Sequence, residues 1–319
     1  MGDNKTADKK NDKSKNPKRR TSGRSLMAIR EERWAWLFIA APFIGFMLFM
    51  AYPIVFSVIA SCSKWTGINS LWDNMCGLEN YIAIFTDEKF WKSMGTTVIY
   101  MIGIPIGMIL GLFIAMGMNR KIPGVRLLTT MYYVPVVSSL VAVSILWAWV
   151  FNYDYGLFNS IIKALTGMHG PNWLGDEVMI KVAMIIFMTW KGLGTSIILY
   201  LAGLQNIPRD YYEAAELDGA SAWDRFKHIT FPLVSPVSFY ILVTSLIGGF
   251  QVFVEVQVMT TNGGINYSAA TIVYYLYDKA FSNGQLGYGC GIAVLLAIII
   301  FVITAFNFMF QNRWVKTMD

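Results

Sequence analysis

The stretch QNIPRDYYEAAELDGASAWDRFKHITFP, residues 205–232, is polar and strongly patterned, and it lies between two long apolar runs. Its residues predict two short helices with a turn between them. Asn206 suits the cap of the first helix, because its side-chain oxygen can accept a hydrogen bond from a free amide of the first turn. Pro208 follows at a position where a missing N–H costs nothing. Gly219 suits the left-handed residue that closes a helix.

The second predicted helix begins at Ser221, which forms a capping-box pattern with Asp224. We expect Pro232 to end this helix, because proline lacks the N–H that a helix interior needs. One face of the first predicted helix carries apolar and small side chains and ends in an aspartate. That face consists of Ile207, Tyr211, Ala214, Ala215 and Asp218. The pattern fits a surface that docks a partner, and it fits equally an amphipathic loop packed on its own domain.

The composition is that of a membrane protein. Of 319 residues, 55% are hydrophobic and only 14% are charged, whereas a soluble domain carries about a quarter charged residues. The pI near 9.1 invites a nucleic-acid interpretation. However, residues 1–33 hold 11 Lys and Arg against 5 Asp and Glu, so the excess charge belongs to a tail. We expect residues 1–25 to form a disordered basic tail and expect no nucleic-acid partner.

Six apolar runs are each long enough for the roughly 20 residues that a spanning helix needs. They cover about residues 34–60, 97–118, 127–151, 182–204, 233–259 and 290–310. These runs predict an all-α integral membrane protein with six transmembrane helices. We therefore expect the chain to lie in a lipid membrane. Lys191 and Glu255 interrupt the fourth and fifth runs.

Loop charges predict the orientation of these spans. The N-terminal tail, residues 119–126, residues 205–232 and the segment after Phe310 together hold 19 of the 26 Lys and Arg residues. The alternate loops hold five. The positive-inside rule therefore places both termini and residues 205–232 in the cytosol.

The first outer loop, residues 62–94, is rich in Trp, Asn and Tyr, and we expect a short helix lying on the membrane near Glu79–Phe85. The third outer loop, residues 260–289, contains turn signals around an expected helix at Ala270–Phe281. These loops either receive an external partner or simply cap the bundle, and the sequence leaves both alternatives open. Cys62 and Cys76 either form a disulfide outside the membrane or act, as Cys290 does, as small apolar residues. No cysteine spacing suits zinc.

Lys191 is the most informative polar residue in the spans, because a charge near mid-bilayer costs at least about 2.5 kcal/mol. It is expected to face a water-filled pathway or to pair with Glu255. Tryptophan beside hydroxyls and amides suits a sugar, which offers an apolar face and a rim of hydroxyl groups. The alternative is that these polar groups join helix to helix. The residues predicted to line a substrate pathway are Thr189, Trp190, Lys191, Gly192, Thr195, Gln251 and Glu255.

Motifs for catalysis are absent from the sequence. It contains no G-x-x-x-x-G-K-[ST] phosphate loop, no H-E-x-x-H and no G-x-S-x-G. The only histidines, His169 and His228, are predicted to lie on opposite sides of the membrane. We therefore expect no enzyme and no cofactor, and we expect any ATP hydrolysis to occur in another subunit.

At residue level, the 205–232 stretch resembles the EAA signature of membrane subunits of binding-protein-dependent ABC importers. The match runs from Glu213-Ala214-Ala215 through Gly219 and Ile229 to Phe231-Pro232, with Phe231 where leucine is usual. Three further stretches resemble the carbohydrate branch, the maltose and oligosaccharide permease type. One is NIPRDYYEAAELDGAS at 206–221, which extends the EAA core. The others are GLENY at 77–81, followed by Phe90 with Gly95 where asparagine is usual, and FQVFVEVQVMTTNGG at 250–264, with Gly264 where proline is usual.

This resemblance, which covers about Trp34 to the end, implies a multi-pass protein of a bacterial cell membrane that imports a sugar. The implied partners are a second permease chain that differs from this one, a cytosolic ATPase dimer that uses ATP and Mg, and an extracellular sugar-binding protein. The residues implied to couple to the ATPase are Glu213, Ala214, Ala215, Asp218, Gly219 and Pro232. By position, Thr189, Lys191, Gly192 and Thr195 fall where the family's sugar-lining residues lie. The alternative class is an ion-coupled secondary transporter that uses a Lys191–Glu255 pair.

Overall fold

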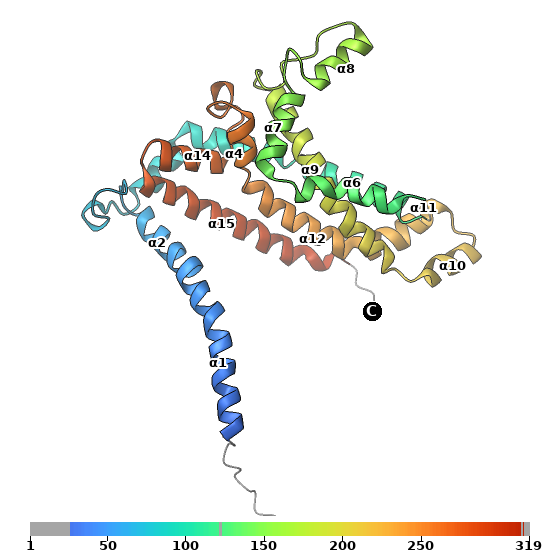
Figure 1. Ribbon diagram of the computed structural model, residues 1–319, viewed down its shortest axis with the longest axis horizontal. Coiled ribbons are helices and arrows are strands. Elements are labelled where there is room, and N and C mark those ends of the chain that lie inside the picture. The colour runs from blue at the N-terminus through green and yellow to red at the C-terminus, as the bar shows by residue number, and fades with distance from the viewer. Residues whose placement is uncertain (1–25, 121–122, 314, 316–319) are drawn as a thin grey trace, which may run out of the picture. The chain divides into compact units, whose positions relative to one another are not determined.

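The computed structural model describes residues 26–120, 123–313 and 315. The chain divides into two units, residues 1–54 and residues 55–319 (Figure 1). Across the described ranges the chain is helical, without a strand and with one isolated bridge, between Ser63 and Met75. This confirms the predicted all-α class. The predicted disordered tail, residues 1–25, lies outside the described residues.

The first unit is a long apolar helix. It contains α1 (Leu26–Phe46), the π-helical turn η1 (Met47–Ala51) and the first residues of α2 (Tyr52–Ser61). Large side chains along it are exposed, for example those of Phe38 and Phe49. Exposed apolar side chains on a helix of this length suit contact with lipid.

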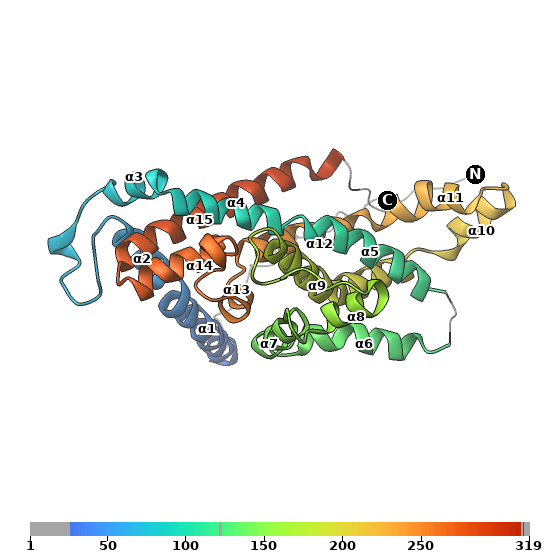
Figure 2. The same cartoon turned by 90° about the horizontal axis from the view of Figure 1, so that it is seen from above.

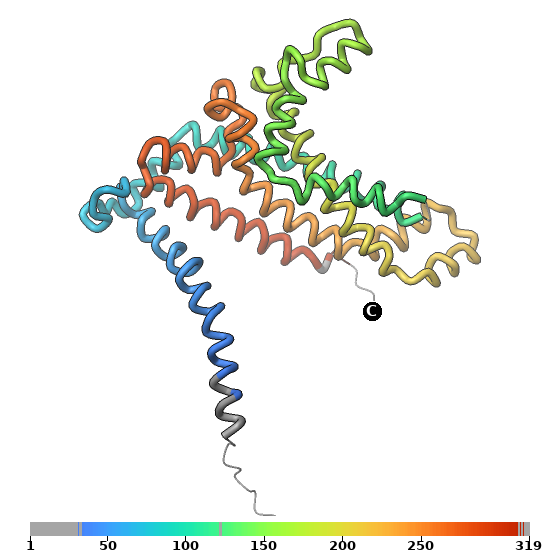
Figure 3. Tube along the Cα trace, in the orientation of Figure 1, coloured from blue at the N-terminus to red at the C-terminus, as the bar shows by residue number. Residues whose placement is uncertain are grey.

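The second unit contains most of the helices, which Figures 2 and 3 follow along the chain. From the outer loop to the third span they are η2 (Trp72–Asn74), α3 (Glu79–Thr86), α4 (Glu88–Tyr100), α5 (Gly103–Met118), α6 (Val125–Val137) and α7 (Leu140–Val150). Next come α8 (Leu157–Thr166), α9 (Met179–Gln205), α10 (Arg209–Leu217), α11 (Ala222–Arg225), η3 (Phe226–Thr230) and α12 (Phe231–Phe250). The last are α13 (Val254–Met259), η4 (Ile265–Tyr267), α14 (Ile272–Tyr277), η5 (Asp278–Ser282), α15 (Leu286–Phe310) and η6 (Gln311–Arg313).

Five helical segments among the described residues are long and apolar enough to cross a membrane. They are Trp34–Ser61, Glu88–Met118, Met179–Gln205, Ala222–Phe250 and Leu286–Phe310. A sixth span arises if the bent pair α6 and α7 counts as one. The structure therefore agrees with the predicted number of spans.

The third predicted span, residues 127–151, forms two helices with a 102° bend between them instead of one straight helix. Pro135 lies in the last turn of α6 and cannot donate a backbone hydrogen bond there. Ser138 then takes extended backbone angles (φ −74°, ψ 149°), and its hydroxyl donates to the Val134 carbonyl oxygen at 2.7 Å. The chain consequently turns before α7 begins.

The fifth predicted span, residues 233–259, also divides. Helix α12 ends at Phe250, directly after Gly248 and Gly249, and α13 starts at Val254. Two adjacent glycines weaken a helix because they lose the most backbone entropy on folding. The break brings the short helix α13 beside α7, where both contribute to the same apolar core.

Close packing of α5 on α9 forms the centre of this unit. Gly103, Gly107 and Gly111 are buried at four-residue spacing on one face of α5. A Cβ at Gly103 would lie 2.8 Å from the Thr189 hydroxyl oxygen, and one at Gly111 would lie 2.8 Å from the Ser196 Cβ. Small residues repeated every fourth position allow membrane helices to approach closely. The four-residue spacing of these glycines is a signal for this contact that the sequence itself contains.

The predicted outer-loop helices are both present, as α3 and as α14 followed by the π-helical turn η5. They meet at Asp87, whose carboxylate accepts hydrogen bonds from the Tyr275 and Tyr288 hydroxyls and lies 3.4 Å from the Lys279 ammonium. Burial raises the pKa of Asp87, but the Tyr275 hydroxyl, the Lys89 backbone amide and Lys279 outweigh burial and hold the pKa below its usual value. Cys62, Cys76 and Cys290 are free thiols.

Candidate functional site

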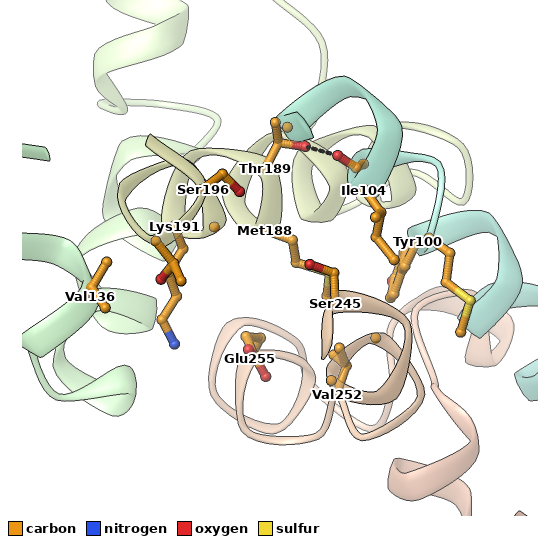
Figure 4. Close-up of a pocket in the computed structure, with 17 residues that line it drawn as sticks. Tyr100, Ile104, Val136, Met188, Thr189, Lys191, Ser196, Ser245, Val252 and Glu255 are labelled. Atoms are coloured by element: carbon orange, nitrogen blue, oxygen red, sulfur yellow. Dashed lines mark hydrogen bonds between the residues drawn. The ribbon is translucent and has the colours of Figure 1, made fainter. Parts of the chain in front are cut away.

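A cavity of about 420 Å³ lies among helices α4, α5, α6, α9, α12 and α13 of the second unit (Figure 4). We name it the central cavity. Its lining residues are Tyr100, Met101, Gly103, Ile104, Gly107, Val136, Met188, Thr189, Lys191, Gly192, Thr195, Ser196, Ser245, Gly248, Gly249, Val252 and Glu255. Pockets of this volume hold small molecules, and here most of the wall is apolar with a few polar groups.

Glycines make room for the central cavity. A Cβ added at Gly192 or at Gly248 would meet no atom within 4 Å, because both positions face open space. At Gly249 the added Cβ would lie 3.4 Å from the Met101 side chain. The glycine pair in α12 therefore ends that helix and also opens the wall of the cavity.

Lys191 and Glu255 bring opposite charges to the central cavity. Figure 4 shows the Lys191 side chain extending from α9 toward the side of the cavity where Glu255 lies on α13. The Glu255 residue is only 9% exposed. Within residues 26–120 and 123–313, neither side chain forms an ion pair or a hydrogen bond. Burying an unpaired charge is costly, so a ligand or water with complementary groups would stabilise this arrangement.

Hydroxyl groups supply the other polar contacts of the cavity. Thr189 Oγ1 donates to the Gly103 carbonyl oxygen at 3.4 Å, while the residue Thr195 is exposed. Ser245 adds a hydroxyl from α12, and Tyr100 lines the wall while its hydroxyl donates to the Ala269 carbonyl oxygen at 3.1 Å. Tyr100 and Ser245 were absent from the prediction, because no local pattern links α4 and α12 to α9.

Five of the seven predicted pathway residues line the central cavity, and two do not. Trp190 turns away and packs on Trp147, with ring centroids 5.1 Å apart. Gln251 is exposed at the C-terminal end of α12 and does not line the cavity. Trp190 instead belongs with the aromatic cluster that joins α7 to α9, which is the helix-joining role that the sequence had left open.

Residues 205–232, which we name the coupling stretch, lie at the far end of α9 from its N-terminus (Figure 1). The predicted cap at Asn206 is wrong. Asn206 has helical backbone angles and ends α9, with its N–H bonded to the Ala202 carbonyl oxygen at 3.2 Å. Pro208 occupies the cap position of α10 instead. Because α9 extends to Gln205, no residue before Ile207 is free to act as that cap.

The turn between α10 and α11 forms as predicted. Gly219 has φ +79°, a left-handed conformation that favours glycine. The Ala220 N–H donates to the Ala215 carbonyl oxygen at 2.9 Å, and the Gly219 N–H donates to the Glu216 carbonyl oxygen at 3.1 Å. This pair of bonds satisfies the last carbonyls of α10. The capping box of Ser221 and Asp224 is also present.

Pro232 does not end the second helix, contrary to the prediction. The π-helical turn η3 precedes it, with the Phe231 N–H bonded to the Phe226 carbonyl oxygen. Pro232 then lies in the first turn of α12, where its missing N–H is tolerated. As a result, Ala222–Phe250 is a helical segment of 29 residues that runs from the coupling stretch to the central cavity.

The first helix of the coupling stretch has an inner and an outer face. Tyr212 points inward, and its hydroxyl lies 3.0 Å from that of Thr230. Glu213 and Ala214 are exposed, and Leu217 is 90% exposed. A leucine so exposed beside an acidic and a small residue presents a surface that a partner could cover. Ala215 is half-buried and Asp218 is exposed.

Comparison with known proteins identifies the family. Residues 103–316 match the model for the "Binding-protein-dependent transport system inner membrane component". The chain belongs to this family. The permease is therefore a multi-pass inner-membrane protein, as the sequence predicted, and a transport subunit by family.

Two relatives illustrate the match. The permease is 34% identical over 293 residues to the lactose transport system permease protein LacF of Rhizobium radiobacter, and the alignment covers 90% of this chain and 97% of LacF. It is 32% identical over 276 residues to the arabinooligosaccharides transport system permease protein AraP of Bacillus subtilis, and this alignment covers 84% of this chain and 85% of AraP. A chain of a bacterial ABC transporter involved in import of the acidic polysaccharide alginate shares the fold, with a TM-score of 0.79 at 20% identity. The superposition covers 91% of this chain and 99% of that chain.

Proposed function

We propose that this chain is the transmembrane permease subunit of an ATP-driven importer of a sugar or oligosaccharide. The curated relatives LacF and AraP are named for lactose and arabinooligosaccharides, and each aligns over more than four-fifths of this chain. An external binding protein would deliver the sugar. A second permease chain would complete the pathway, and a cytosolic ATPase dimer would supply ATP hydrolysis, with Mg and ATP bound by that partner alone.

The observation that carries the coupling proposal is the continuous helical segment Ala222–Phe250. Its first residues belong to the coupling stretch, and Ser245, Gly248 and Gly249 near its end line the central cavity. If the ATPase moved the coupling stretch, this single helical segment would transmit the movement to the wall of the central cavity. Such a rigid-body movement can switch a transporter between two states. In the proposal, the exposed residues Glu213 and Ala214 contact the ATPase.

The central cavity provides the proposed sugar site. A buried carboxylate accepts hydrogen bonds only, so Glu255 suits the hydroxyl donors of a sugar. The Lys191 ammonium supplies hydrogen-bond donors from the opposite side. The hydroxyls of Thr189 and Thr195 can both donate and accept hydrogen bonds. The lining glycines allow the flat faces of a sugar ring to approach the backbone. Gly192 is the cavity glycine that the sequence prediction included.

The test uses the tagged full-length chain co-expressed with its neighbouring subunits and purified for mass spectrometry. Wild type is expected to retain a second permease and an ATPase, and Glu213→Arg is expected to lose the ATPase while keeping the second permease. Glu213→Gln is the conservative variant. Asp154→Arg, the same charge reversal at an exposed site predicted to lie outside the cell, is the matched control. ATP-driven sugar uptake by wild type in liposomes completes the experiment. Uptake by a pure homodimer without ATP would support the ion-coupled alternative instead.

A further inference from the structure

A second cavity, of about 460 Å³, lies where the ends of α5 and α9 meet α10 and α11. We name it the arginine cavity, because Arg120, Arg209 and Arg225 line it from three different segments. Asn119 and Gln205 add side-chain amides, and no acidic side chain is among its lining residues. The cavity is separate from the central cavity, with which it shares no lining residue.

The positive charge of the arginine cavity is only partly compensated. Arg225 lies 3.3 Å from the Glu216 carboxylate, whose side chain is 72% exposed. Arg120 and Arg209 have no acidic partner within the part of the chain that the structure describes. The C-terminal ends of α5 and α9 also carry about half a negative charge each. Three guanidinium groups against one carboxylate and two helix ends leave roughly one positive charge without compensation.

We propose that the arginine cavity binds a phosphate group, carried either by an anionic lipid headgroup or by a free phosphate ion. Guanidinium groups match phosphate because they donate two parallel hydrogen bonds to its oxygens. The cavity has room for a phosphate with its glycerol. It also lies where the candidate spans α5 and α9 end, at Met118 and Gln205, and basic pockets at the ends of spans are suited to lipid headgroups.

A phosphate in this cavity would connect the spans to the coupling stretch. Arg120 follows α5, whereas Arg209 and Arg225 belong to α10 and α11. One anion that contacts all three would hold the two coupling helices against the ends of α5 and α9. The bound phosphate therefore stiffens the connection between the coupling stretch and the membrane domain.

The experiment measures binding to the purified full-length protein in a phosphate-free neutral detergent. Native mass spectrometry compares retention of phosphatidylglycerol with that of phosphatidylcholine, and calorimetry measures binding of inorganic phosphate. The test variant is Arg120→Gln/Arg209→Gln. The matched control is Arg126→Gln, an exposed arginine at the start of α6 that does not line the cavity. Size-exclusion and thermal unfolding check that each variant folds.

Wild type and Arg126→Gln are expected to bind, and the double variant to lose at least about tenfold in affinity. Selective retention of phosphatidylglycerol identifies a lipid headgroup, whereas stoichiometric phosphate binding without lipid preference identifies the free ion. Arg120→Lys/Arg209→Lys keeps the charge but not the paired hydrogen bonds, so it is expected to bind at an intermediate level, and it replaces the glutamine variant if that one does not fold. Unchanged binding by the double variant, or no binding by wild type, overturns the proposal. Neither measurement requires ATPase or sugar, so failure here leaves the proposed transport function standing.

Discussion

The coupling stretch and the central cavity are built from different kinds of contact. The turn and caps of the coupling stretch depend on hydrogen bonds between residues at most five positions apart, such as Ala220 to Ala215 and Asp224 to Ser221. The central cavity is enclosed by residues from Tyr100 to Glu255, on helices far apart in the chain. This difference explains why the turn and the capping box of the coupling stretch could be predicted from the sequence. The enclosure of the central cavity, in contrast, depends on how the helices pack.

The largest effect is expected at the close contact between α5 and α9 beside the central cavity. Gly111→Leu would place side-chain atoms against Ser196 on α9, because a Cβ there already lies 2.8 Å from the Ser196 Cβ. Overpacking of this kind costs about 1–3 kcal/mol and sometimes more, so we expect loss of folded protein in fluorescence size-exclusion. Gly117→Leu is the control on the same helix, since a Cβ at Gly117 meets nothing within 4 Å. Equal loss for both variants would show that the close α5–α9 contact is not decisive.

The second prediction concerns the charges of the central cavity. Lys191→Met and Glu255→Gln are each expected to lower sugar uptake in liposomes about 10- to 100-fold, as expected for lost charged hydrogen bonds. Thermal stability should not fall, because neither side chain has a partner among the described residues that the substitution would remove. The double variant separates two explanations. Additive losses indicate independent contacts with substrate, whereas a double variant no worse than either single one indicates a Lys191–Glu255 pair.

The third prediction tests whether local conformation alone maintains the coupling stretch. Gly219→Val forces a β-branched residue into φ +79°, at a cost of about 1–3 kcal/mol. We expect ATP-driven uptake to fall while the protein remains folded in the membrane. Gly219→Asn is the control, because asparagine tolerates this conformation. If the valine variant transports like the asparagine variant, the turn is not needed for coupling.

The smallest effect is expected in the outer loops, far in sequence from both regions. The pKa of Asp87 is below its usual value of 3.8, so Asp87 stabilises the fold above that value and the contribution is lost as pH falls through the lower folded pKa. Asp87→Asn keeps one acceptor oxygen for the tyrosine hydroxyls, so it is expected to reduce stability by only about 0.5–1.5 kcal/mol near pH 6. The difference in melting temperature between wild type and variant should shrink as pH falls below about 4. A difference independent of pH would contradict the charged hydrogen bonds.

Much of the fold could be predicted from apolar runs and from short-range turn and cap patterns. The spans, the helix at α3, the left-handed turn at Gly219 and the capping box of Ser221 all depend on composition or on near neighbours. Two errors in the coupling stretch arose where neighbouring helices extended past their expected ends, at Asn206 and Pro232. In both cases, continuity with a long membrane helix outweighed the local preference for a cap or a break.

By itself, the sequence determined that this chain is a multi-pass helical protein with two short helices between its fourth and fifth spans, because hydrophobic length and short-range hydrogen bonding are local properties. It also indicated which charges are unusual within the spans. Only the tertiary structure decided that Lys191 and Glu255 share a cavity, that Trp190 packs away from it, and that α12 joins the cavity to the coupling stretch. These outcomes depend on which helices touch, and that is decided by packing between residues far apart in the chain, as between Trp147 and Trp190 and across the Gly111–Ser196 contact.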